Sequence, residues 1–107
     1  MSIRLEHANL AVRDVDAIAR FLMTAFPDFA LRREGRREDG TRWLHVGTAA
    51  TYVALYEARQ APAEVREPYS GKPGLNHLGY EVDDVEGLRE RMRAAGYRDS
   101  TIPNGHP

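Results

Sequence analysis

An internal repeat constrains the fold of this chain more than any other feature of its sequence. Residues 5–25 (LEHANLAVRDVDAIARFLMTA) align without a gap with residues 75–95 (LNHLGYEVDDVEGLRERMRAA), at an offset of 70 positions. Nine of the 21 aligned pairs are identical or similar, and His7 falls on His77. Strand–helix patterning shared by chance would explain the apolar matches but not the paired histidines. We therefore interpret the two segments as copies of one structural unit.

Each copy predicts a strand followed by a helix. Apolar residues alternate over residues 3–12 and 75–82, which is the period of a strand with one buried face. Asp14 and Asp84 stand where helix N-caps are expected, and apolar residues recur at helical spacing after each of them. Gly96 follows the second helix as a C-terminal stop.

Three further strands are predicted between the copies. Residues 29–38 and 41–46 flank Asp39-Gly40, a strong hairpin signal, and residues 51–58 are rich in β-branched and aromatic side chains. The arginine-rich run at 32–38 is interrupted by carboxylates, so we interpret it as a solvated hairpin arm. Residues 59–74 hold three prolines and two glycines and predict a linker or an active-site loop.

The predicted fold is therefore α+β, with paired βαβββ modules that form a curved mixed sheet. Residues 1–58 form the first module, 59–74 the linker loop, and 75–107 a truncated second module. That second module holds a strand, a helix and the start of another strand at 97–102, and a turn is expected at Asn104-Gly105. Because such a domain leaves a sheet edge unpaired, we expect either a fragment, which we favour, or a partner that completes it.

Charge and composition exclude several classes of protein. The formal net charge of −1 lacks the basic excess that nucleic-acid binding requires. The chain has no cysteine, which excludes disulfides and thiolate chemistry and leaves oxygen and imidazole groups as metal ligands. It has no apolar run of the roughly 20 residues that span a bilayer, and no signal-peptide core follows Met1. We expect a cytoplasmic protein without a membrane partner.

The two aligned histidines are the residues that point most clearly to chemistry. A single histidine on a strand is usually a satisfied polar residue, but here two equivalent strands present one each. If the modules pack with approximate two-fold symmetry, His7 and His77 converge, which suits a divalent metal ion such as zinc. His45 shares a face with Trp43; it is a candidate to line the same cavity, but we favour its interpretation as a hairpin histidine. No role is assigned to His106.

Glu57 is the candidate carboxylate for the same ion. It ends the apolar strand that starts at Tyr52, and counting by twos places it on the face of Val53 and Leu55, which predicts that it points into a cavity. A position just beyond the strand end, in water, is an equally good interpretation. Two imidazoles and one carboxylate leave coordination positions open, as in octahedral iron, manganese or nickel sites.

These features together resemble the vicinal oxygen chelate superfamily, which includes glyoxalase I, extradiol dioxygenases, fosfomycin-resistance enzymes and bleomycin-binding proteins. The resemblance runs from residue 3 to about residue 106, and its spacing is closest to glyoxalase I. It implies that His7, Glu57 and His77 bind a divalent metal (Zn, Ni, Mn or Fe) and that Glu57 also carries a proton. The family's fourth ligand, a glutamate on the last strand of the second module, has no counterpart in the chain.

The resemblance implies a small-molecule substrate whose two neighbouring oxygens are chelated by the metal, in isomerase, lyase or dioxygenase chemistry. It also implies a homodimer in which His7 and Glu57 of one copy meet His77 of another. The alternative is a metal-free protein that sequesters a small molecule, as the bleomycin-binding members do. A third hypothesis is a structural member that uses the fold for dimerisation alone.

Overall fold

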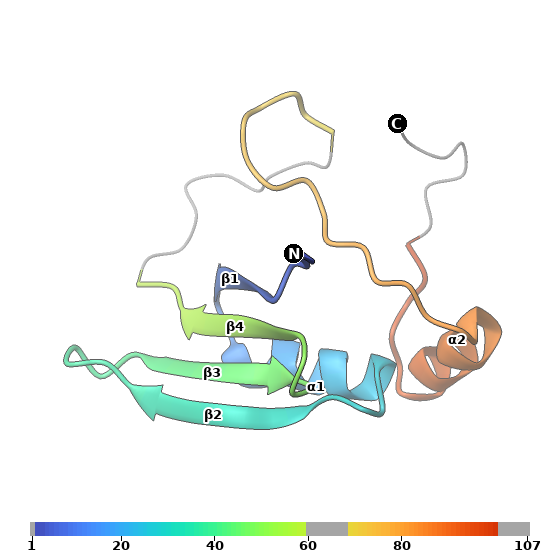
Figure 1. Ribbon diagram of the computed structural model, residues 1–107, viewed down its shortest axis with the longest axis horizontal. Coiled ribbons are helices and arrows are strands. Elements are labelled where there is room, and N and C mark those ends of the chain that lie inside the picture. The colour runs from blue at the N-terminus through green and yellow to red at the C-terminus, as the bar shows by residue number, and fades with distance from the viewer. Residues whose placement is uncertain (1, 60–68, 101–107) are drawn as a thin grey trace.

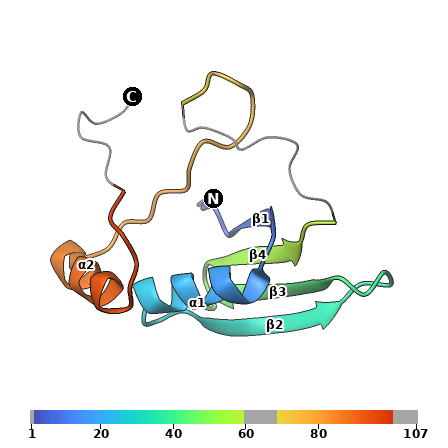
Figure 2. The same ribbon diagram turned by 180° about the vertical axis from the view of Figure 1, so that it is seen from behind.

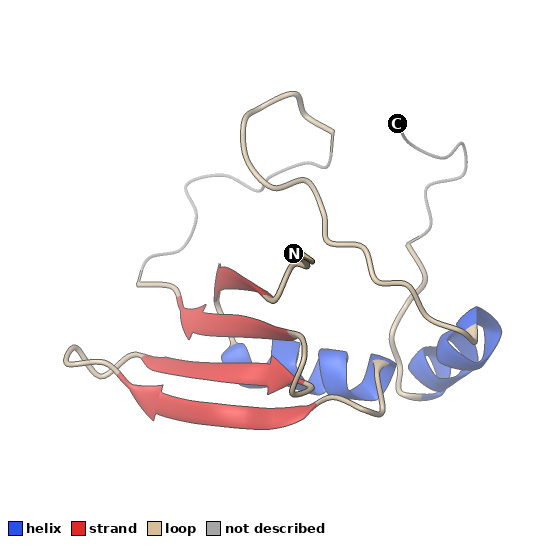
Figure 3. Ribbon diagram, in the orientation of Figure 1, coloured by secondary structure: helices blue, strands red, loops and turns tan. Residues whose placement is uncertain are grey.

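The computed structural model describes residues 2–59 and 69–100, which form a mixed sheet with a helix against one face and a second helix beside the first (Figures 1 and 3). In chain order, the elements are β1 (His7–Val12), α1 (Val15–Ala25), β2 (Ala30–Arg36), β3 (Arg42–Gly47), β4 (Tyr52–Glu57) and α2 (Val85–Ala94). None of the helices in this described part is long and apolar enough to cross a membrane.

The sheet has four strands in the order β1-β4-β3-β2. β1 pairs with β4 in parallel, and β3 pairs with β4 and with β2 in antiparallel fashion. A parallel pair needs a crossover connection, and α1 begins that crossover. The α+β class and the first βαβββ module are therefore confirmed, although β1 begins at His7 rather than at residue 3.

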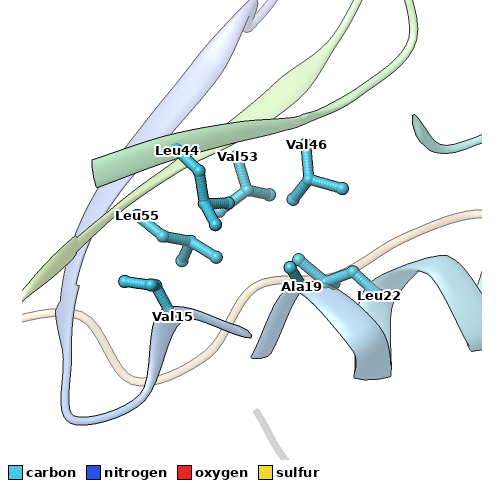
Figure 4. Packing of buried hydrophobic residues seen from close by; sticks show 7 residues of the cluster. All are labelled: Val15, Ala19, Leu22, Leu44, Val46, Val53 and Leu55. Atoms are coloured by element: carbon cyan, nitrogen blue, oxygen red, sulfur yellow. The ribbon is translucent and has the colours of Figure 1, made fainter. Parts of the chain in front are cut away.

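Helix α1 carries its apolar stripe to the sheet and closes the core. The Asp14 side chain caps the helix by accepting a hydrogen bond from the Ala17 N–H at 3.0 Å. Figure 4 shows the buried side chains meeting between the helix and the sheet, and Figure 2 shows the layer from the helix side. The core cluster comprises Val15, Ala19, Leu22, Leu44, Val46, Val53 and Leu55.

Replacing the α1 cap with alanine should cost about 1 kcal/mol of unfolding free energy. Asp14→Ala removes the acceptor for the Ala17 N–H and leaves that donor to water. Urea denaturation followed by circular dichroism measures the change. Asp28→Ala, an exposed aspartate in the loop after α1, serves as the control and should unfold at the same urea concentration as the parent chain. An unchanged midpoint for Asp14→Ala would contradict the capping role.

In the second copy of the repeat, the structure confirms the helix but not the strand. Asp84 caps α2 through the Gly87 N–H at 2.9 Å, and Gly96 after the helix has a φ of 93°. Residues 75–82, predicted as a strand, pair with no other strand of the described chain, and residues 97–100 form none either. The rest of that last predicted strand, the turn at 104–105 and His106 lie outside the described residues.

Side-chain contacts join the second copy of the repeat to the first. The ring of Tyr80 packs against Phe26 at 4.7 Å and against Phe29 at 6.3 Å between centroids, at the end of α1. The Arg91 guanidinium of α2 donates to the carbonyl oxygens of Thr24 and Ala25 at 2.9 and 2.7 Å. These contacts attach the second copy to the C-terminal end of α1 rather than to a sheet edge. The division into modules 1–58 and 75–107 with a linker at 59–74 remains a proposal.

Candidate functional site

The sheet face opposite α1, here called the open face, is lined by rings. Strand register places His7 beside Tyr52, and Trp43 beside Tyr56. Val53 and Leu55 point into the core on the α1 side of the sheet. The residues that alternate with them on β4, Tyr52, Ala54 and Tyr56, therefore point to the open face. The sequence therefore buries aliphatic side chains on one face of the sheet and presents aromatic and polar ones on the other.

Four of these rings form a continuous row across three strands. His7 stacks on Tyr52 with centroids 4.7 Å apart and planes 9° from parallel. Tyr52 stacks on His45 at 4.9 Å and 27°, and His45 contacts Trp43 at 5.1 Å and 50°. A row of this kind offers flat apolar surface with polar edges, which suits a small planar ligand.

Arginines from β2 and the following turn lie over two tyrosines of the open face, Tyr52 in the row and Tyr56 beside it. The guanidinium carbon of Arg32 is 4.0 Å from the Tyr52 ring centroid, and that of Arg37 is 4.1 Å from the Tyr56 centroid. Both distances are typical of cation–π contacts. Arg33 pairs with His45 in the strand register. The run at 32–38 is thus only partly a solvated arm, because three of its guanidinium groups belong to the open face.

Burial and nearby positive charge together lower the pKa of His45 below its usual value. Burial is the largest cause, followed by the guanidinium groups of Arg33 and Arg32 and then by His7. Burial and each of these positive charges disfavour the protonated, charged form of the imidazole. The imidazole of His45 therefore holds a proton less readily than an ordinary histidine, and it stands in a positive electrostatic environment.

This shift predicts that the protein loses stability as the pH falls through the unfolded-state histidine value of about 6.5. The unfolded chain then takes up a proton that the folded chain refuses, so acid favours unfolding. Urea midpoints at pH 7.5 and 5.5 measure the effect. His45→Gln should reduce the difference between the two midpoints, and an equal difference in parent and variant would contradict the assignment.

His7, the first predicted ligand, begins β1 on the open face. Its side chain is 43% exposed, and its Nδ1 lies 2.9 Å from Glu6 Oε1. His77 lies in the unpaired segment, and its Nδ1 lies 2.8 Å from Asn76 Oδ1. The neighbours of His77, Leu78 and Gly79, line a cavity of about 240 Å³ together with His7. The two residues that follow His77 therefore lie beside His7 in the structure.

Glu57, the third predicted ligand, is not brought to His7. The register pairs it with Val12, five positions along β1 from His7, and it lies on the α1 side with Val53 and Leu55. Its Oε1 accepts a hydrogen bond from the Arg42 N–H at 2.7 Å. Within residues 2–59 and 69–100, no three histidine, aspartate or glutamate side chains are grouped as metal ligands.

Sequence reasoning missed the part that Tyr52 and the arginines play on the open face. The sequence pattern predicts Tyr52 only as part of an apolar strand, whereas in the structure its ring links His7 to His45. One sequence signal could have found it: Tyr52 and Tyr56 are an even number of positions apart on β4, so they share the face opposite Val53 and Leu55. For Arg32 no such signal existed, because its side of the sheet depends on an irregularity in β2.

Comparison with known proteins agrees with this architecture. The family model described as the Glyoxalase/Bleomycin resistance protein/Dioxygenase superfamily matches residues 6–106. A search of curated proteins returned no match. Similar solved structures include a glyoxylase/bleomycin resistance protein/dioxygenase domain from Frankia sp. EAN1pec, with 26% identity and a TM-score of 0.69, over 90% of this chain and 70% of that one.

Two further structures share the fold at lower identity. SMU.1112c is 24% identical with a TM-score of 0.66, over 90% of this chain and 77% of its own. The fosfomycin resistance protein FosX from Listeria monocytogenes is 19% identical with a TM-score of 0.65, over 92% of this chain and 73% of its own. A mutant of FosX was solved with Mn(II) and 1S,2S-dihydroxypropylphosphonic acid. At these identities the likeness supports the fold alone.

Proposed function

The chain belongs to the Glyoxalase/Bleomycin resistance protein/Dioxygenase superfamily, and from this premise we propose that it binds a small molecule on its open face and acts on it with a divalent metal ion. The reaction would be of the isomerase, lyase or dioxygenase type found in this superfamily. His7 and His77 are the proposed imidazole ligands. The metal would be Zn, Ni, Mn or Fe, and FosX, a protein of similar fold, binds Mn(II).

One observation carries this proposal: both histidines are held in the same way by the residue before them. Glu6 Oε1 lies 2.9 Å from Nδ1 of His7, and Asn76 Oδ1 lies 2.8 Å from Nδ1 of His77. An oxygen at this distance favours a proton on Nδ1, which makes Nε2 the nitrogen with the lone pair. Metal-binding histidines are commonly oriented by an oxygen partner of this kind. The donor chemistry therefore fits a divalent ion at these two positions.

A divalent ion held there would polarise two neighbouring oxygens of a ligand and stabilise negative charge that develops on them. The chain's own residues have simpler tasks. Tyr52 stacks on His7 and fixes the plane of its imidazole, while Glu6 fixes which nitrogen carries the proton. The row of rings that continues through His45 to Trp43 would hold the body of the ligand beside the histidines.

The part proposed for Glu57, as third ligand and proton carrier, has the least support. Its carboxylate accepts a hydrogen bond from Arg42 N–H on the α1 side of the sheet. His7 lies on the opposite face of the sheet and five positions away along β1. We expect Glu57→Gln to leave the metal affinity unchanged, and a large loss of affinity in this variant would restore Glu57 to the ligand set.

We also propose a homodimer, because α2 has an apolar stripe that α1 covers only in part. α2 has no buried residue, and Val85 in its first turn is 50% exposed. A second copy would cover this surface and could supply further metal ligands. Sedimentation should give twice the chain mass of 12.1 kDa. A well-folded monomer at tens of micromolar would contradict the dimer.

A second function, metal-free sequestration of a small molecule, is favoured by one specific observation. The described residues group no three metal-ligating side chains, whereas the row of rings and the arginines already form a surface for a ligand. Such a protein would bind its ligand with the same affinity in the presence of a chelator and in the presence of added Mn(II). The bleomycin resistance members named in the matched family description make this a natural alternative.

Metal analysis of the purified protein, followed by dialysis against Mn(II), tests the choice between the two functions. The metal-enzyme proposal predicts about one divalent ion per site, removed by chelator and restored by Mn(II). Protein that takes up no Zn, Ni, Mn or Fe while it keeps its fold by circular dichroism would overturn that proposal and support sequestration.

A further inference from the structure

We propose that the ligand of the open face is a small aromatic carboxylate, with its anionic group held by Arg33 and its ring among the rings of the groove. This inference deepens the proposed function and rests on its placement of the ligand on that face. The site is a groove of about 260 Å³ on the open face. Its lining includes Arg33, Arg37, Trp43, His45 and Tyr56.

A β-bulge puts two successive guanidinium groups on one side of the sheet. Neighbouring residues of a regular strand point to opposite faces. In β2 the register shifts between Leu31, which pairs with Val46, and Arg33, which pairs with His45. Arg32 is therefore an extra residue, and its guanidinium lies over Tyr52 on the open face. Bulges often serve to re-aim a side chain beside a binding site.

Within the described part of the chain, these guanidinium groups have no carboxylate as an ion-pair partner, although the charge of Arg37 helps to lower the pKa of nearby Asp39 after its hydrogen bonds to Thr41. Arg32, Arg33 and Arg37 form no ion pair with a carboxylate of residues 2–59 or 69–100, and the groove is lined by no aspartate or glutamate. After burial, the charges of Arg33 and Arg32 are the next causes of the lowered pKa of His45, which places both guanidinium groups near the groove. Guanidinium groups in this state bind carboxylates in a paired, fork-like geometry.

The walls of the groove select an aromatic body. Trp43, His45 and Tyr56 present rings, and between them Ala54 contributes only a methyl group. The Trp43 ring lies flat across Gly35, where an added Cβ would come within 2.8 Å of it. A groove of about 260 Å³ is slightly below the range of drug-sized pockets, so it suits a single-ring acid.

Trp43 provides a direct readout, because it is the chain's one tryptophan and lines the groove. Its emission, excited at 295 nm, would be titrated with benzoate, with the neutral analogue benzamide, with the non-aromatic cyclohexanecarboxylate, and with inorganic phosphate. The change in Trp43 emission should reach saturation at a lower concentration of benzoate than of the other three compounds. These should bind at least about tenfold more weakly, because each lacks the carboxylate or the aromatic ring.

Arg33→Gln should weaken benzoate binding about tenfold, and Arg33→Lys should fall between that variant and the parent. Arg20→Gln, an exposed arginine on α1, is the matched control and should bind as the parent does. Circular dichroism and the urea midpoint confirm that each variant is folded. Equal binding of benzoate and benzamide, unchanged binding in Arg33→Gln, or no saturation with benzoate would overturn the inference.

The same titration in a chelator and in Mn(II) separates this inference from the proposed function. Tight benzoate binding in a chelator, by a chain that takes up no metal, would leave the aromatic carboxylate site standing and remove the metal enzyme. A chain that binds Mn(II) but shows no preference for benzoate would do the reverse. Phosphate that competes as strongly as benzoate would show a site for anions in general and would overturn the aromatic part.

Discussion

Replacing Gly47 with alanine is expected to destabilise the protein by about 3 kcal/mol, a large share of the 5–15 kcal/mol that stabilises a typical domain. A Cβ at this position would lie 2.3 Å from the Thr51 carbonyl oxygen and 2.5 Å from Tyr52 Cα. Both are backbone atoms, one in the β3–β4 connection and one in the first residue of β4, and they cannot rotate away. The strands must therefore separate locally, which moves Tyr52 out of the row between His7 and His45.

Urea denaturation followed by Trp43 emission and by circular dichroism measures this loss. Gly79→Ala is the matched control, since its added Cβ would meet no heavy atom within 4 Å. We expect the control to unfold with the parent chain and Gly47→Ala to unfold at a much lower urea concentration. A Gly47→Ala midpoint equal to that of the control would mean that the close approach at the end of β3 does not exist.

The second large effect is expected at the proposed metal ligands. His7→Ala and His77→Ala should each reduce Mn(II) affinity by about a hundredfold or more, since loss of a partner outside the ligand shell alone costs 10- to 100-fold. Each variant removes one of two imidazoles that the chain contributes in equivalent positions of its repeat. Equilibrium dialysis at fixed pH gives the affinities, and circular dichroism shows that the fold is intact.

His106→Ala and Glu57→Gln are the controls for this measurement. His106 was assigned no role from the sequence, and Glu57 lies on the α1 side of the sheet. Both should bind Mn(II) as the parent chain does. If only one of the two histidine variants loses Mn(II) affinity, the proposal of a shared site is wrong, and the ion is held by one copy of the repeat.

Much of the fold could be predicted because its signals are local. The caps at Asp14 and Asp84 mark the helix starts, and Asp39-Gly40 marks the β2–β3 hairpin. The strand expected at residues 75–82 could not be excluded in this way, since its alternation is as good as that of β1. Whether such a segment becomes a strand depends on a hydrogen-bonding partner, and residues 75–82 have no partner strand in the described chain.

The candidate site was predictable only in part, for reasons of register. Alternation alone placed His7 opposite the apolar side of β1 and Glu57 with Val53 and Leu55. Alternation could not show that His7 and Glu57 lie on different faces of one sheet, because this depends on the parallel pairing of β1 with β4. The bulge that re-aims Arg32 likewise depends on long-range pairing and leaves no local signature.

In the proposed metal site, the imidazoles of His7 and His77 hold one divalent ion. Electron spin echo measurements on protein-bound Mn(II) test it most directly, because a coordinated imidazole nitrogen modulates the echo. We predict nitrogen modulation from two histidines in the parent chain, reduced to one in His7→Ala and likewise in His77→Ala. An echo without nitrogen modulation, or one that either variant leaves unchanged, would contradict the claim.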